Sequence, residues 1–137
     1  MQIREVMTTD PITLASSASV TEAARAMREY NVGDVVIRKD GKVCGIVTDR
    51  DIVVRVLSEG KDPAKTTLDA ICSHHLTTVS PDQGAGDAAR IMSEKAIRRL
   101  PVMKDNQLLG IVSLGDLAVH LDKKSCLASI SEAAPSR

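Results

Sequence analysis

Aromatic residues are almost absent from the sequence: Tyr30 stands alone among 137 residues, with neither Trp nor Phe. Proteins that bind single-stranded nucleic acids stack bases on several exposed rings, so this scarcity argues against such a platform. An excess of charge is lacking as well, because 18 lysine and arginine residues balance 18 aspartate and glutamate residues. The sequence therefore carries no electrostatic footprint for nucleic acids or for an anionic membrane.

Long apolar runs are also missing, and none approaches the roughly 20 residues of a membrane span. Residues 1–4 do not open a signal peptide, and the three cysteines (Cys44, Cys72 and Cys126) form no Cys-x-x-Cys pair. We therefore expect a cytoplasmic protein with reduced thiols. A Ser/His/Asp arrangement, a catalytic carboxylate pair and a P-loop are all missing from the sequence, so we expect that the protein is not an enzyme.

The sequence does contain an internal duplication. Shifted by 65 residues, it aligns with itself without a gap: residues 23–27 (AARAM) fall on 88–92 (AARIM), and 45–48 (GIVT) fall on 110–113 (GIVS). Asp51 falls on Asp116 in the same alignment. Self-similarity at one fixed period indicates a repeated structural unit.

Each copy predicts the element order β-α-β-β-α. In the first copy, residues 12–14 favour a strand, and Ser19 with Glu22 forms a capping box ahead of a helix over residues 20–30. An Asp-Gly turn at residues 40–41 then predicts a β-hairpin, and a second helix follows Thr48. The second copy repeats this order with strands at 77–79, 100–103 and 108–112 and a last helix after Ser113.

The boundaries follow from this pattern. We expect a first repeat over residues 1–58, a polar linker over 59–67 and a second repeat over 68–124. Residues 125–137 have no counterpart in the repeat, and we expect a mobile tail there. A unit of about fifty residues is too small to build a comfortable core alone, so the two units should pack face to face.

The strand-to-helix junction of each repeat is the best candidate for a binding site. A glycine precedes a hydroxyl residue that opens a helix, where free N–H groups and the helix dipole favour an anion. Asp51 or Asp116 follows three residues after Thr48 or Ser113, and a carboxylate accepts two hydrogen bonds from a vicinal diol. This arrangement suits a ribose-phosphate. A pure N-capping role for the same residues is an open alternative.

The paired β-α-β-β-α unit, residues 6–9 (VMTT) and the ending GIVTxRD at residues 45–51 resemble the cystathionine-β-synthase (CBS) domain. Two such domains in tandem resemble a Bateman module, and the resemblance covers about residues 3–122. The free-standing pair is also similar to small two-CBS proteins of the actinobacterial hypoxic-response type. The resemblance implies an α+β (α/β) fold with two repeats related by pseudo-two-fold symmetry.

The resemblance further implies two clefts between the repeats for an adenosine nucleotide, which is AMP, ADP, ATP or S-adenosylmethionine. In this family the aspartate of the closing motif holds the ribose, the hydroxyl residue faces phosphate or ribose, and the base lies among apolar residues. By position, one cleft (site A) would contain Ser113, Asp116, Arg98, Arg99, Ile111, Gly115, Met7, Ile12, Val32 and Gly33. The other (site B) would contain Thr48, Asp51, Arg50, Ile46, Cys72, Thr77 and Ile97.

The two copies differ just before the hairpin, where Arg98 and Arg99 stand in the second copy against Gly33 and Asp34 in the first. An arginine fork suits phosphate oxygens, whereas a carboxylate repels them. We therefore expect site A to bind phosphate better, with Arg50 partly compensating in site B. The alternative is a pair of solvated surface arginines.

These inferences predict a regulatory nucleotide-binding module without a catalytic cofactor, which forms a homodimer and signals in trans to an unidentified effector protein. One alternative is a structural or protein-interaction module with empty clefts. Another is a redox or metal-responsive protein that uses Cys72 with the histidines. We expect no metal site, because His74 and His75 would point to opposite faces of an extended segment and His120 is distant in sequence.

Overall fold

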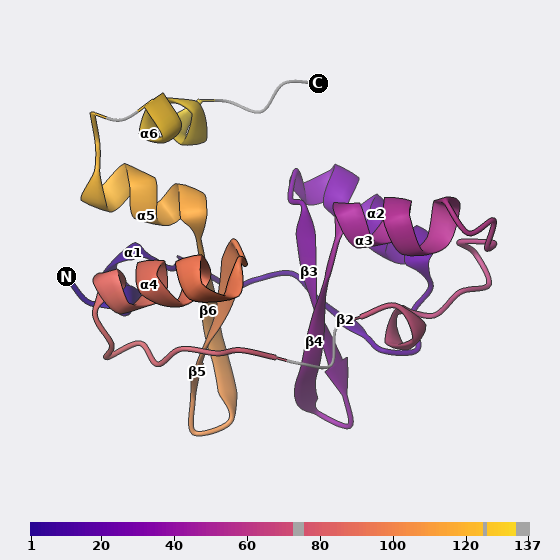
Figure 1. The fold of residues 1–137 in the computed structure, drawn as a ribbon. Helices are drawn as coiled ribbons and strands as arrows, with labels where there is room; N and C mark the ends of the chain where they lie inside the picture. The colour runs from indigo at the N-terminus through magenta and orange to yellow at the C-terminus, as the bar shows by residue number, and fades with distance from the viewer. Residues whose placement is uncertain (73–75, 125, 134–137) are drawn as a thin grey trace. The chain divides into compact units, whose positions relative to one another are not determined.

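The computed structural model describes residues 1–72, 76–124 and 126–133. The chain divides into two compact units: unit 1 combines Met1–Asp10 with the residues from Thr77 onward, and unit 2 is Pro11–Leu76. Each unit has one three-stranded sheet with its own helices (Figure 1). The predicted α+β class is confirmed, with two related halves.

Unit 2 contains β2 (Thr13–Ala15), α2 (Val20–Tyr30), β3 (Asp34–Lys39), β4 (Lys42–Thr48), α3 (Asp49–Ile52), the π-helical turn η1 (Val53–Leu57) and the 3-10 turn η2 (Leu68–Ala70). Its sheet has the order β2-β3-β4, in which β2 is parallel to β3 and β3 is antiparallel to β4. This is the predicted order of the first repeat, with η2 added from the sequence of the second.

Unit 1 contains α1 (Ile3–Val6), β1 (Thr8–Thr9), α4 (Ala85–Lys95), β5 (Arg99–Lys104), β6 (Gln107–Ser113), α5 (Leu114–Leu121) and α6 (Cys126–Glu132). Its sheet has the order β1-β6-β5, and both of its pairings are antiparallel. The strand expected at residues 77–79 is present only as a single parallel bridge between Val79 and Val102. Pro101 explains this difference: its counterpart Val36 donates a backbone hydrogen bond to Ile12, and proline has no N–H to donate.

The helix predicted over residues 20–30 has those bounds. Its capping box is formed, because the Glu22 amide donates to Ser19 Oγ at 3.1 Å and the Ser19 amide donates to the Glu22 carboxylate. Both predicted hairpin turns are also confirmed. The φ angles of Asp40 and Gly41 are 52° and 76°, and those of Asp105 and Asn106 are 51° and 62°. Positive φ at both central residues is the mark of a type I′ turn.

The first few residues of each repeat are bonded to the body of the other repeat. The Ile3 amide donates to the Gln83 carbonyl at 2.8 Å, and at the equivalent position the Leu68 amide donates to Ala18 at 2.9 Å. The side chains of Ile3 and Leu68 are fully buried in the respective cores. In Figure 1 the indigo helix α1 lies beside α4 accordingly. The repeats therefore exchange their leading segments, which the sequence analysis did not predict.

Both cores are built mainly from aliphatic side chains of the sheet and of the helices and turns of the same unit. In unit 2 these are Val20, Ala23, Met27, Val35, Ile37, Val47, Ile52, Val56, Leu68 and Ile71 with Cys72. In unit 1 they are Ile3, Val6, Val79, Ala85, Ala88, Met92, Leu100, Val102, Val112 and Leu117. Ala23 on α2 and Ala85 and Ala88 on α4 are buried in these cores, whereas Ala24 and Ala89 are exposed.

The segment after residue 124 contains α6, which packs on α5. Ala128 is fully buried, and a Cβ on Gly115 would lie 3.0 Å from Ser131 Oγ. We expected a tail over 125–137, and its last four residues lie outside the described part. None of the helices described is both long enough and apolar enough to cross a bilayer.

Gly110 tests the exchanged segment. A Cβ there would lie 2.5 Å from the Thr8 carbonyl oxygen, so Gly110→Ala must push β1 away from β6. We expect the free energy of unfolding to fall by about 1–3 kcal/mol, as measured by chemical denaturation. Gly86→Ala is the matched control, because its Cβ meets nothing within 4 Å on helix α4. It should raise stability by about 0.5–1 kcal/mol, and equal losses in both variants would contradict the close approach.

Candidate functional site

The junction between β6 and α5 closes on itself through a reciprocal pair of hydrogen bonds. The Asp116 amide donates to Ser113 Oγ at 3.0 Å, and the Ser113 amide donates to Asp116 Oδ2 at 2.9 Å. Thr8 Oγ1 lies 3.5 Å from both carboxylate oxygens of Asp116. Ser113 and Asp116 are half-buried. The capping role considered from the sequence is thus formed, and one carboxylate oxygen is left with only the long Thr8 contact among the bonds described.

The junction between β4 and α3 repeats this geometry in unit 2. The Asp51 amide donates to Thr48 Oγ1 at 3.1 Å, and the Thr48 amide donates to Asp51 Oδ2 at 2.8 Å. Here the second oxygen, Oδ1, lies 3.7 Å from Arg55 Nε. Arg55 also donates through Nη1 to the Ile71 carbonyl at 3.0 Å. The carboxylate of Asp51 is therefore paired with a guanidinium that the leading segment holds in place.

The two junctions differ in their neighbouring charges. The duplication places His120 where unit 2 has Arg55, and His120 is exposed. Asp116 thus has no arginine one turn later on its helix, whereas Asp51 has one. A carboxylate oxygen that no cation holds is more available to a ligand hydroxyl.

The structure places both predicted arginines next to the Ser113 cap. Arg99 pairs with Ser113 across β5 and β6, and the Leu114 amide donates to the Arg98 carbonyl at 2.9 Å. Arg98 is exposed and Arg99 is half-buried. In unit 2 the equivalent position pairs Asp34 with Thr48. The charge difference predicted from the sequence therefore stands directly beside the two caps.

Other predicted site residues fall into one unit or the other. Unit 1 brings Met7, Ile111 and Gly115 to its cap: Thr8 pairs with Ile111, and the Met7 side chain approaches Gly110. Arg50 and Ile46 are close in sequence to the Thr48 cap in unit 2, whereas Cys72 of the same unit lies beside Cys44 and Asp69. Each predicted cleft also draws on the opposite unit, through Ile12, Val32 and Gly33 for site A and Thr77 and Ile97 for site B. The shared clefts accordingly stay a prediction.

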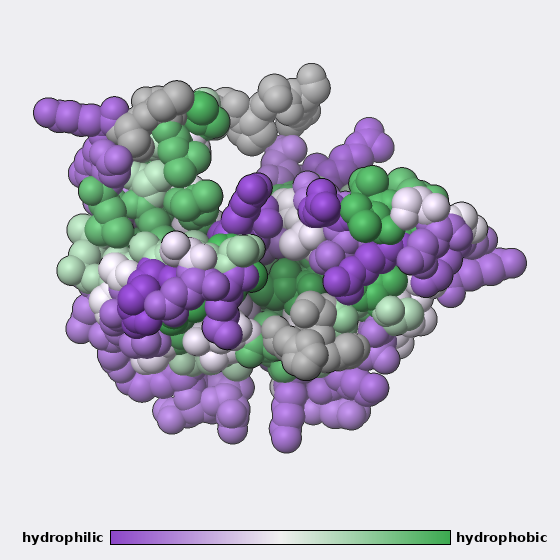
Figure 2. Space-filling view, in the orientation of Figure 1, coloured by the Kyte–Doolittle hydropathy of each residue, from purple (hydrophilic) through white to green (hydrophobic). Residues whose placement is uncertain are grey.

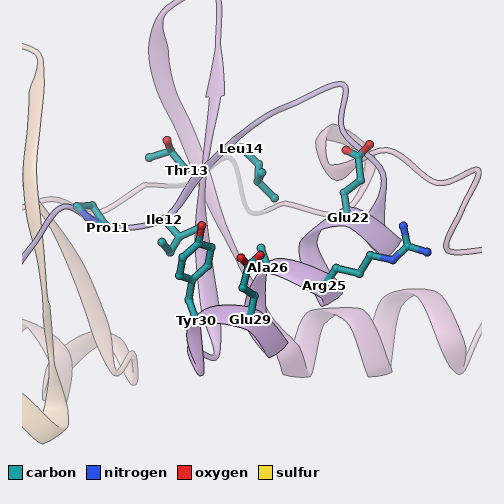
Figure 3. A pocket seen from close by; sticks show the side chains of 9 residues that line it. All are labelled: Pro11, Ile12, Thr13, Leu14, Glu22, Arg25, Ala26, Glu29 and Tyr30. Atoms are coloured by element: carbon teal, nitrogen blue, oxygen red, sulfur yellow. The ribbon is translucent and has the colours of Figure 1, made fainter.

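A groove of about 460 Å³ lies between β2 and α2 in unit 2 (Figure 3). Sequence reasoning missed it, although Ile12 lines it. Glu22, Arg25 and Glu29 also line it, and their helical spacing on one face of residues 20–30 is the signal that points there. The lining residues are Pro11, Ile12, Thr13, Leu14, Glu22, Arg25, Ala26, Glu29 and Tyr30.

Cys72 faces another thiol rather than an open cavity. It is 4% exposed, and its Sγ lies within 4.8 Å of the Cys44 Sγ and of an Asp69 carboxylate oxygen. Burial, and then the neighbouring Cys44, raises the pKa of the Cys72 thiol to about 11. Cys44 lies 25 residues before Asp69 in the sequence, so only the folded chain shows that it joins Asp69 and Cys72. His74 and His75 lie outside the described residues.

The family model for the CBS domain matches residues 3–58 and again residues 68–123. The chain belongs to the CBS-domain family. CBS pairs of this kind are modules with a regulatory role, and the predicted resemblance is confirmed.

Curated and solved CBS proteins are similar over most of the chain. CBS domain-containing protein YhcV of Bacillus subtilis is 37% identical over 118 residues, which cover 86% of this chain and 84% of that protein. Hypoxic response protein 1 of Mycobacterium tuberculosis is 32% identical over 119 residues, covering 86% and 83%. The predicted similarity to the hypoxic-response type is therefore confirmed.

Two solved CBS pairs share the fold. Hypoxic Response Protein I, whose crystal structure has two coordinated zinc ions, gives a TM-score of 0.80 at 31% identity and covers 88% of this chain and 99% of its own. The CBS domain pair of protein MJ0100, crystallised with 5-methylthioadenosine and S-adenosylmethionine, gives 0.78 at 28% identity, covering 87% and 98%.

The raised pKa of Cys72 predicts slow alkylation. Because a thiol reacts as its thiolate, a pKa of about 11 leaves only a small reactive fraction at neutral pH. In protein kept with a chelator, the rate of iodoacetamide modification at Cys72, followed by peptide mass spectrometry, should rise about tenfold per pH unit from pH 7 to pH 9. A rate that levels off below pH 9 would contradict the raised pKa.

Proposed function

We propose that this CBS pair is a regulatory sensor of an adenosine nucleotide, which it binds at the two capped strand-to-helix junctions. The observation that carries the proposal is the junction of Ser113 and Asp116, where a carboxylate and a hydroxyl lie at the start of α5 and Arg99 pairs with Ser113 in the sheet. The adenosine ligands bound to the related MJ0100 pair support the choice of ligand.

The ribose would bind to Asp116. Its Oδ2 is engaged by the Ser113 amide, which fixes the carboxylate in one orientation. Its Oδ1 has the long Thr8 contact alone among the bonds described, and a ribose hydroxyl would replace that contact with a short charge-assisted hydrogen bond. The cap and the ligand site are thus compatible, because one carboxylate has acceptor capacity for both.

The phosphate would bind beside the ribose. Helix α5 begins at Leu114, and the positive end of its dipole favours an anion. Arg98 and Arg99 enter the sheet at the same end and add positive charge. The junction of unit 2 has negative charge at this place, since Asp34 and Asp49 flank Thr48 there. We therefore assign the phosphate-bearing ligand to the junction of unit 1.

The output would be a change in how the protein engages other chains. A ligand shifts such an equilibrium only by its differential affinity for the two states. Exposed apolar side chains are available for assembly: Val53, Val54 and Leu57 on η1 and Leu121 on α5 are 45–55% exposed. Figure 2 shows green surface over both elements. We propose a homodimer through these helices and an effector protein in trans.

A ligand-free interaction module is the second candidate. It is favoured by the closed caps themselves, because Thr48 with Asp51 and Ser113 with Asp116 already satisfy the helix ends without any ligand. In that case the same residues would matter for stability alone.

Titration calorimetry with AMP, ADP, ATP and S-adenosylmethionine tests the sensor. We expect saturable binding of a phosphate-bearing ligand, which Asp116→Ala weakens about 10- to 100-fold, as expected for a hydrogen bond to a charged group. Asp51→Ala is the matched control for the unit 1 junction, because it removes the same cap from unit 2; it should leave the affinity of the unit 1 junction for the phosphate-bearing ligand within a few-fold of that of the unchanged protein.

Thermal unfolding of the same variants separates capping from binding. Ser113→Ala and Asp116→Ala should each lower stability by about 1 kcal/mol through loss of the cap. Only Asp116→Ala should also abolish most of the ligand affinity. Absence of heat and of any thermal shift with all four adenosine ligands would leave the ligand-free module as the function.

A further inference from the structure

Unit 2 contains a cluster of two thiols and one carboxylate at the edge of its core. Cys44 lies on β4, Asp69 lies in η2 and Cys72 follows that turn. Their Sγ atoms and a carboxylate oxygen all lie within 4.8 Å of one another. We propose that Cys44, Asp69 and Cys72 form a binding site for one zinc ion. This proposal does not rest on the nucleotide function.

The donor set matches the coordination chemistry of zinc. Zinc binds thiolate sulfur at about 2.3 Å and carboxylate oxygen at about 2.0–2.2 Å in a tetrahedron. Those bond lengths place two ligating sulfurs about 3.8 Å apart, and the three candidate ligand atoms already lie within 4.8 Å of one another. Two sulfurs select zinc over calcium or magnesium, which prefer all-oxygen sites. Three protein ligands leave the fourth position for water.

The backbone that carries two of the ligands is held firmly. The Asp69 amide donates to the Ser16 carbonyl at 3.0 Å, and the Cys72 amide donates to the Leu68 carbonyl at 2.9 Å. Leu68 is fully buried in the core, and Arg55 donates to Ile71 between the two ligands. The leading segment of the second repeat is thus fixed against the body of the first, and the ligands are pre-organised before any ion binds.

The charges around the cluster also balance a zinc ion. Two thiolates and one carboxylate carry three negative charges, zinc supplies two positive charges, and Lys39 Nζ lies 3.8 Å from Asp69 Oδ2. Cys72 is buried and Cys44 is half-buried, whereas Asp69 is partly exposed, which gives the ion a path from solvent. Without metal the buried thiol stays protonated, and a coordinated ion displaces that proton.

The thiol–carboxylate cluster lies in unit 2 and has no counterpart at the equivalent positions of unit 1. A shift of 65 residues carries Cys44 to Leu109, Asp69 to Arg4 and Cys72 to Met7. A leucine, an arginine and a methionine offer zinc no suitable ligand. The capping pairs, in contrast, are present in both copies. We therefore expect one zinc ion per chain, bound in unit 2.

Cobalt(II) substitution tests the site on the full-length protein. The protein is reduced, stripped with a chelator, dialysed and titrated with cobalt(II), and then with zinc(II). We expect one cobalt ion per chain, an intense thiolate-to-cobalt charge-transfer absorption in the near ultraviolet, and displacement of cobalt by one equivalent of zinc. Native mass spectrometry should show the same single zinc ion.

Three variants assign the ligands. Cys44→Ser and Cys72→Ser should each abolish most of the charge-transfer absorption, and Asp69→Asn should weaken cobalt binding at least tenfold while the band remains. Asp69 is partly exposed, so this variant should fold even if a cysteine variant does not. Cys126→Ser is the control for thiol content, and it should bind cobalt as the unchanged protein does.

Two results would overturn the proposal. Cobalt binding without a charge-transfer band, or with a band that Cys44→Ser and Cys72→Ser leave unchanged, would place the metal elsewhere. The second result is a Cys44–Cys72 disulfide, seen as a loss of the mass of two hydrogen atoms and in the peptide map, together with no cobalt binding after reduction. The two thiols would then be a redox pair instead.

Discussion

The hydrogen bonds that tie the leading segment of each repeat to the body of the other repeat are the constraint on which both candidate sites depend. In unit 1 they bring Thr8 beside Asp116, and in unit 2 they bring Cys72 beside Cys44. Each unit of about seventy residues completes its core with an aliphatic side chain from the other repeat, Ile3 or Leu68. Small domains gain from such additions because their own cores bury too little apolar surface.

At the capped junctions one carboxylate closes the helix end and keeps a second oxygen that, in our proposal, binds the ligand. Asp51 and Asp116 both accept a bond from the residue that caps their helix, and this bond fixes the direction of the remaining oxygen. The neighbours then decide how the two junctions differ, since Arg55 pairs with Asp51 while Arg99 stands beside Ser113. The cap is the same in both copies of the repeat, whereas the charged residues beside the cap differ between them.

Local chemistry made much of the fold predictable. The capping box at Ser19 and the Asp40-Gly41 turn act within a few residues, so the sequence shows them directly. The segment exchange was not predictable, because it depends on backbone hydrogen bonds, which residues of any type except proline can donate. The sequence therefore does not reveal their partners. The missing strand before Val79 follows from one proline in a neighbouring strand, and the thiol cluster joins residues that only the tertiary fold brings together. The sequence indicated the caps at both junctions as an alternative role for these residues, and the caps are formed; the ligand role of the junctions and the shared clefts stay predictions.

Amide hydrogen exchange on the full-length protein tests the exchanged segments most directly. The account predicts that the amides of Ile3, Arg4, Leu68 and Asp69, which donate across the repeats, exchange as slowly as those of β3 and β5 and lose their protection together with them in denaturant. If these four amides exchange at the rate of unprotected backbone while β3 and β5 remain protected, the segments are not part of the folded units, and the account is wrong.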